Sequence, residues 1–289
     1  MSETVPTRSA LNRPWVLKML ISIVVVLAFG TWGYYDAVIK YPERGARYAE
    51  WAQWQYLQAA SNADREEFGW FLNNASVDDP VAELAHLSSE EEMARNLEAS
   101  QNPDSRSHHR GVAKLARLRW LEGLRLIGRL SPEHTTIDDP RQRLEELSAK
   151  WASTPQPKPL HGFDIPSQWA IMAVGYIVGL YLIILFIRVA SKKYTWDPEA
   201  KRLTLPGGAS IVPDDLEEID KRKWDKFIVF LKIRKDHEQL GGREIRVDTY
   251  RYAHVEDWIL EMERARFPSE EEGEADKDTP ADAAEPAAS

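Results

Sequence analysis

The sequence predicts an α-helical membrane protein with two transmembrane helices, a mainly helical domain between them and a small α+β domain after the second. Three observations predict this fold class. Two long stretches lack charged residues, the region between them has helical periodicity, and the region after the second contains short β-rich runs separated by turn residues. The expected segments are an N-terminal stretch 1–18, spans 19–39 and 165–187, an inter-span domain 40–164, an α+β domain 188–268 and an acidic tail 269–289.

The two uncharged stretches are Met19–Tyr35 and Ile165–Ile187. A membrane span needs roughly 20 apolar residues, and both stretches qualify when their aromatic and basic ends are counted. A cleaved signal peptide is an alternative for the first stretch, but its apolar core is long and no small-x-small cleavage site precedes Asp36. A pair of apolar core helices is the other alternative, and the flanking residues argue against it. The residues expected to anchor the spans at the bilayer surface are Trp15, Lys18, Arg188, Lys192 and Lys193.

Basic residues near the span ends predict the orientation. Lysine and arginine are enriched in cytoplasmic flanks, and more of them lie on the two terminal sides than on the loop side. The sequence therefore predicts an integral protein of the bacterial inner membrane with both termini in the cytoplasm. The terminal-side residues are Arg8, Arg13, Lys18, Arg188, Lys192, Lys193, Lys201 and Arg202, and the loop-side residues are Lys40, Arg44, Arg47, Lys150 and Lys158.

The inter-span region is expected to form several helices. Pro42 is expected to break the first span and to start a new helix, and acid-acid-proline sequences predict helix starts at Pro80 and Pro140. The clearest helical wheel covers Arg110–Leu130. Its basic side suggests contact with anionic lipid or a partner, whereas the leucines within that side favour one wall of a helical bundle. The expected apolar face holds Val112, Leu115, Ala116, Leu126, Ile127 and Leu130, and the expected basic face holds Arg110, Lys114, Arg117, Arg125 and Arg129.

The region after the second span changes to β-rich runs and then to one helix. "YTWD", "RLTLPGG", "ASIVP", "KFIVFLKI" and "REIRVDT" are separated by turn residues, and alternation at Ile245, Val247 and Thr249 indicates a strand with one buried face. From Val255 the apolar residues follow helical spacing. The pattern predicts several antiparallel strands closed by one amphipathic helix.

This arrangement, carried by "RLTLPGGASIVPDDLEEIDKRKWDKFIVFLKI" and the closing "VEDWILEME", resembles the bacterial pleckstrin-homology-like (PH-like) domains. The likeness rests on this pattern of strands followed by a helix, and it covers roughly a quarter of the chain. It implies a scaffold for contacts with lipid, peptide or protein partners, and no catalytic residues.

A basic stretch within that domain is the candidate contact site. Lys221, Arg222, Lys223 and Lys226 surround Trp224. Lys221, Arg222 and Lys223 are expected to lie in a turn before a strand. This turn is either simply solvated or a patch that contacts lipid or a partner. Because acidic residues lie close by, the solvated turn is favoured, and Trp224 is expected to anchor the core.

Composition and motifs favour no catalytic site, metal site or cofactor. The chain has no cysteine, and its seven histidines show no metal-ligand spacing. Nucleophile elbows, phosphate-binding glycine loops and dinucleotide fingerprints do not occur. The acidic excess lies mostly in the tail 269–289, which lacks aromatic, Ile, Leu and Val residues and is expected to be disordered. A nearly neutral remainder argues against nucleic-acid binding.

We therefore expect a non-enzymatic integral membrane protein that scaffolds or localises protein partners at the lipid bilayer. Two alternatives remain open on the sequence. One is an envelope enzyme, or the regulator of one, that acts through the inter-span domain. The other is an accessory subunit of a membrane transport or secretion complex. Transport by this chain alone is disfavoured, because the only ionisable group of the spans is Asp36, at the edge of the first span.

Overall fold

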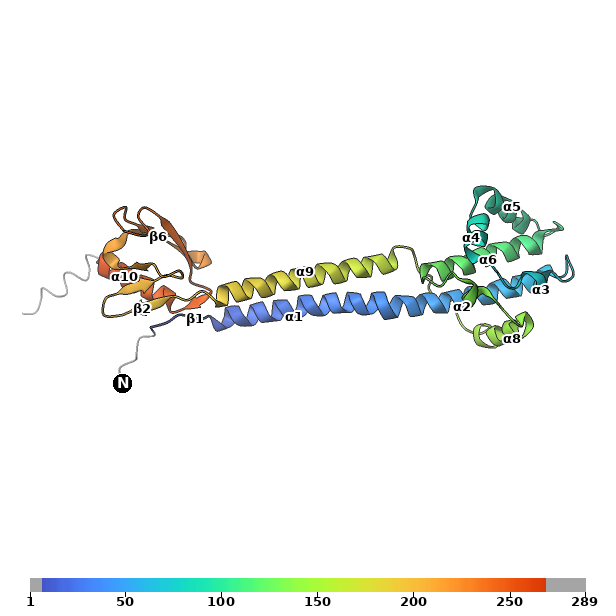
Figure 1. Ribbon diagram of the computed structural model, residues 1–289, viewed down its shortest axis with the longest axis horizontal. Helices are drawn as coiled ribbons and strands as arrows, with labels where there is room; N and C mark the ends of the chain where they lie inside the picture. The colour runs from blue at the N-terminus through green and yellow to red at the C-terminus, as the bar shows by residue number, and fades with distance from the viewer. Residues whose placement is uncertain (1–6, 269–289) are drawn as a thin grey trace, which may run out of the picture. The chain divides into compact units, whose positions relative to one another are not determined.

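The computed structural model describes residues 7–268, and the predicted acidic tail lies outside them. The chain is about 60% helical, with two apolar helices and small antiparallel sheets, which confirms a mixed helical and β layout. It divides into two compact units (Figure 1). The sheet unit contains the residues up to Val26 and those from Ile177 onward, and the helical unit is Leu27–Tyr176.

The first apolar helix, α1 (Arg13–Tyr35), continues without a break into α2 (Tyr41–Ala63) through a π-helical turn, η1 (Asp36–Lys40). The expectation that Pro42 breaks the helix is therefore wrong. A proline inside an α-helix lacks an amide donor, and its ring meets the carbonyl one turn earlier. The wider π-turn, in which Tyr41 N–H donates to the Asp36 carbonyl, precedes the proline and accommodates it.

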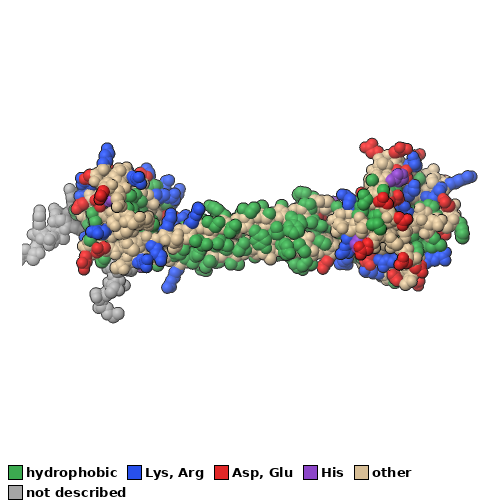
Figure 2. Space-filling model, in the orientation of Figure 1, with side chains coloured by type: hydrophobic (Ala, Val, Ile, Leu, Met, Phe, Trp, Pro, Cys, Tyr) green, Lys and Arg blue, Asp and Glu red, His purple; other side chains and the backbone are tan. Residues whose placement is uncertain are grey.

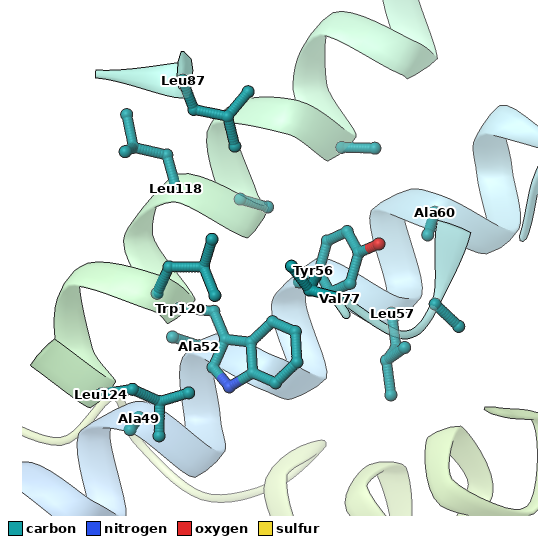
Figure 3. Packing of buried hydrophobic residues seen from close by; sticks show 14 of the residues in the cluster. Ala49, Ala52, Tyr56, Leu57, Ala60, Val77, Leu87, Leu118, Trp120 and Leu124 are labelled. Carbon is teal, nitrogen blue, oxygen red and sulfur yellow. The ribbon is translucent and has the colours of Figure 1, made fainter. Parts of the chain in front are cut away.

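The rest of the helical unit is a bundle built around α2 and α6 (His108–Leu126). Figure 3 shows Trp120 of α6 lying against α2 near Ala52 and Tyr56, and the Trp120 and Tyr56 rings stack with centroids 5.4 Å apart. The acid-acid-proline helix starts are confirmed, since Asp79 and Asp139 cap the helices that follow them. The remaining helices are α3 (Trp70–Asn74), α4 (Pro80–Leu87), α5 (Glu90–Gln101), α7 (Pro132–Thr135) and α8 (Pro140–Trp151).

The second apolar helix, α9 (Asp164–Ala190), leads into residues 195–266 of the sheet unit, which are called the β-rich module below. One antiparallel sheet contains β2 (Thr195–Asp197), β3 (Arg202–Thr204) and β4 (Ser210–Ile211). The other contains β5 (Leu216–Lys223), β6 (Ile228–Ile233) and β7 (Glu244–Asp248). The module closes with α10 (Val255–Arg266), as its periodicity predicts, because Val255, Trp258, Ile259 and Met262 are buried in the core.

The segment before α1 is part of this module. β1 (Ala10–Leu11) pairs antiparallel with β8 (Tyr252–Ala253), and Ser9 N–H donates to the Tyr194 carbonyl at 2.9 Å (Figure 1). The sequence predicts only an N-terminal stretch here. Two paired residues form too short a strand for a period-2 pattern, so this pairing has no signal in the sequence.

Candidate functional site

In the helical unit, the antiparallel pairing of α1 and α9 depends on glycines of α1. A Cβ atom on Gly30 would lie 3.3 Å from the Gly175 Cα atom, and one on Gly33 would lie 2.9 Å from the Gln168 carbonyl oxygen and the Met172 nitrogen. Without a side chain, the two backbones approach closely, as is common where helices pack in membranes. These two glycines therefore allow α1 and α9 to pack at short range.

Aromatic side chains gather at the α2 end of α1. Trp32 is 67% exposed and donates from its indole nitrogen to Asp36 at 2.9 Å. Tyr34 packs edge-on against Trp169 of α9, with ring centroids 6.1 Å apart. Exposed aromatic rings at both helices are typical of the bilayer interface, where one part of the ring system is apolar and another meets water.

Trp15 has a different role from the surface anchor that the sequence predicts. It is only 8% exposed and stacks on Phe186 of α9, with ring centroids 5.9 Å apart and planes 8° apart. It belongs to the core of the sheet unit together with Val189. Its tryptophan ring therefore joins α1 and α9 to the module.

The four predicted basic anchors behave in two ways. Lys18 donates to the Tyr250 hydroxyl at 2.8 Å and lies 5.3 Å from the centre of that ring, so it holds α1 against the module. Arg188, Lys192 and Lys193 are exposed at the end of α9, and none of them forms an ion pair with any residue in the described range 7–268. Their charges are therefore open to solvent in the described structure.

The candidate contact patch has a different secondary structure from the one that the sequence predicts. Lys221, Arg222 and Lys223 lie in strand β5, so the expectation of a turn is wrong for these three residues, and only Lys226 lies in the turn η3 (Trp224–Lys226). Strand pairing continues as far as Lys223, which pairs with Ile228 of β6. The chain therefore turns only at residues 224–227, where Phe227 has a left-handed backbone conformation.

Carboxylates compensate half of this patch. Lys221 pairs with Glu263 of α10, and Arg222 pairs with Glu244 at 2.9 Å. Arg222 and Lys223 also lie over the Phe230 ring, at 4.5 Å and 5.7 Å from its centre. The expected core anchor, Trp224, is only partly buried at the edge of the core. The four cations therefore do not form one open basic surface.

A buried polar network in the helical bundle was missed by the sequence reasoning. Arg117 is 8% exposed and forms an ion pair with Glu83 of α4. It also donates to the Tyr56 hydroxyl at 2.8 Å and 3.1 Å and to the Asn74 carbonyl at 2.7 Å. Burial raises the pKa of Tyr56 above its usual range. The pKa of Arg117 is lowered by desolvation but is raised overall by Tyr56 and Glu83, so its charge is retained.

The burial of Arg117 shows that the predicted apolar and basic faces of α6 are wrong. The core side of α6 contains Leu118, Trp120 and Leu121, whereas Val112 and Leu115 of the expected apolar face are only partly buried. The sequence did hold a signal that Arg117 faces the core. Trp120 and Leu121 lie three and four residues after Arg117, so all three share one face of the helix. The bundle reading of this helix is confirmed, but its orientation is not.

Within residues 7–268, no group of three or more His, Asp or Glu side chains is placed to hold a metal ion. No protein-family model, curated protein or solved structure matches this chain.

Tyr194 gives the sheet unit a testable pH dependence. Burial, together with Tyr252 and Asp248, raises the pKa of Tyr194 from 10.0 to about 12. The folded state therefore keeps its proton at a pH where the unfolded state has lost it. We expect the contribution of Tyr194 to the free energy of unfolding to be fully present below pH 10. About 2–3 kcal/mol of it should be lost as the pH rises to about 12.

Urea unfolding of the full-length chain in detergent at pH 9 and pH 11 measures this dependence. Tyr194→Phe should reduce the fall in stability between the two pH values, because the substitution removes the group that titrates. An identical pH dependence in Tyr194→Phe and the unchanged protein would contradict the prediction.

Proposed function

We propose that this chain is a non-enzymatic integral membrane protein whose helices α1 and α9 cross a bilayer and whose folded parts bind partners on either side. The observation that carries the proposal is the exposure of apolar surface. Both helices are long and apolar enough to span a membrane, and only 17% and 11% of their most apolar windows are buried. Side chains such as Phe29 and Ile177 are 63% and 68% exposed, and hydrophobic groups cover the visible face of these helices (Figure 2).

A soluble protein does not ordinarily expose a continuous apolar surface of this kind. The core helix of a soluble domain would be mostly buried, so the low burial favours lipid as the solvent of α1 and α9. The close glycine contacts and the exposed aromatic rings add support from packing and from interface chemistry.

In this proposal, residues 7–12 and the β-rich module lie on one side of the bilayer and the bundle lies on the other. We propose that the module side is the cytoplasm of a bacterial inner membrane, because more basic residues flank the terminal ends of the spans. Arg188, Lys192 and Lys193, which lack ion-pair partners among residues 7–268, support this choice.

We further propose that the module is a PH-like scaffold held at the membrane surface. Its three-stranded sheets and closing helix are compatible with that likeness. Lys223 and Lys226 are its candidate contacts for lipid or protein, because Lys221 and Arg222 already bind carboxylates of the module. Such a module would keep a partner close to the bilayer without catalysing a reaction.

Fractionation and reporter fusions test the membrane proposal. The full-length chain should remain in the membrane pellet after alkaline carbonate extraction and enter solution only with detergent. A reporter that is active only in the cytoplasm should be active after Ser289 and inactive after Asn102. Extraction by carbonate alone would overturn membrane insertion, and the opposite reporter pattern would overturn the orientation.

A further inference from the structure

A pocket of about 320 Å³ lies on the helical bundle, between α2, α6, α7 and α8. Its lining includes the apolar residues Trp120, Leu124 and Ile127. Ala46 and Ala49 of α2 line the side of the pocket, and their short side chains leave the space open. The volume is at the lower end of the range for small-molecule sites, so the pocket suits a compact ligand.

Three arginines from three parts of the chain also line the pocket. Arg47 comes from α2, Arg129 from the segment after α6 and Arg143 from α8. Arg143 is held in place because its Nε and Nη2 atoms donate to the Gln53 side-chain oxygen at 3.2 Å and 2.9 Å. Within the described residues 7–268, the guanidinium groups of Arg47 and Arg129 have neither an ion pair nor a hydrogen-bond partner.

Among the described residues, carboxylates compensate Arg143, which pairs with Glu146 at 3.4 Å, but not Arg47 or Arg129. Glu50 pairs with Lys150, which lies outside the lining, and its other oxygen is 3.9 Å from Arg143 Nη2. His134 of α7 also lines the pocket and adds a hydrogen-bonding ring. The pocket lining therefore combines an excess of positive charge, from Arg47 and Arg129, with apolar side chains.

We propose that this pocket binds a small anion in which a phosphate or carboxylate group is attached to an apolar body. Guanidinium groups bind both kinds of oxyanion through paired hydrogen bonds, and the apolar body would lie against Ile127, which is only partly buried. This inference goes beyond the scaffold function, because it makes the bundle a receptor for a soluble ligand. All the residues that carry it belong to the helical unit.

Calorimetric titration of the full-length chain in uncharged detergent tests the proposal. The probes are phenyl phosphate, benzoate, inorganic phosphate and benzyl alcohol. We expect phenyl phosphate or benzoate to bind, inorganic phosphate to bind at least about tenfold more weakly than phenyl phosphate, and benzyl alcohol not to bind. Preference between the first two shows which oxyanion the pocket takes.

The double variant Arg47→Gln/Arg129→Gln should weaken binding at least about tenfold, because each lost charged hydrogen bond alone accounts for about that factor. The matched control Arg65→Gln/Arg125→Gln changes two exposed arginines outside the lining and should bind as the unchanged protein does. Both variants should keep the unchanged melting temperature. Equal binding by the Arg47/Arg129 variant, equal binding of benzyl alcohol, or no binding of any anion at about 10 mM would overturn the proposal.

Discussion

Trp258→Ala is expected to lower the free energy of unfolding of the β-rich module by about 3–5 kcal/mol, the usual cost of removing a buried tryptophan. Trp258 is 2% exposed and stacks on Trp196 with ring centroids 6.1 Å apart. Truncation leaves a cavity between α10 and the sheet that holds Trp196. Since small domains are stable by only about 5–15 kcal/mol, a large share of the module's stability should be lost.

Pulse proteolysis of the full-length chain in detergent across a urea series measures this loss, with cleavage in the module and in the bundle followed separately. Phe267→Ala, at a side chain just beyond α10 that is 44% exposed, is the matched control and should cost less than about 1 kcal/mol. The bundle should stay resistant in both variants. A Trp258→Ala module as resistant as the unchanged one would show that Trp258 does not support the core.

Arg117→Met is expected to lower the free energy of unfolding of the helical bundle by about 3 kcal/mol. The substitution retains an unbranched, mostly apolar side chain but removes the partner of Glu83 and both donors to the Tyr56 hydroxyl. Breaking a buried ion pair costs about 3–5 kcal/mol, and we expect the lower end because Glu83 remains 25% exposed and can be hydrated.

The same proteolysis experiment, followed at cleavage sites in the bundle, measures this effect. Arg125→Met on the exposed side of α6 is the matched control and should change stability by less than about 0.5 kcal/mol. If Arg117→Met is as stable as the unchanged bundle, methionine packing replaces the network and the ion pair adds no net stability.

Local patterns in the sequence were sufficient for most of the elements. The apolar stretches, the capped helix starts at Pro80 and Pro140, and the change from β-rich runs to the helix at Val255 all depend on neighbouring residues. The break at Pro42 was wrong because the sequence does not reveal a π-turn that accommodates the ring.

The candidate site depended more on long-range contacts. The sequence shows the basic residues Lys221 and Arg222 side by side, but their partners Glu263 and Glu244 come from later elements of the module. The pocket residues Arg47, Arg129 and Arg143 are far apart in the sequence, and only the packing of α2, α6 and α8 brings them together. No periodicity connects such residues.

The sequence by itself determined the two apolar helices, the helical region between them, the β-rich region after them and the lack of cysteine chemistry, because period, charge and composition are local properties. Tertiary structure decided that Trp15 is a core residue, that residues 10–11 form a strand with residues 252–253 and that Arg117 faces inward. These outcomes depend on which distant surfaces exclude water from a side chain, and burial of that kind is a property of the packed chain.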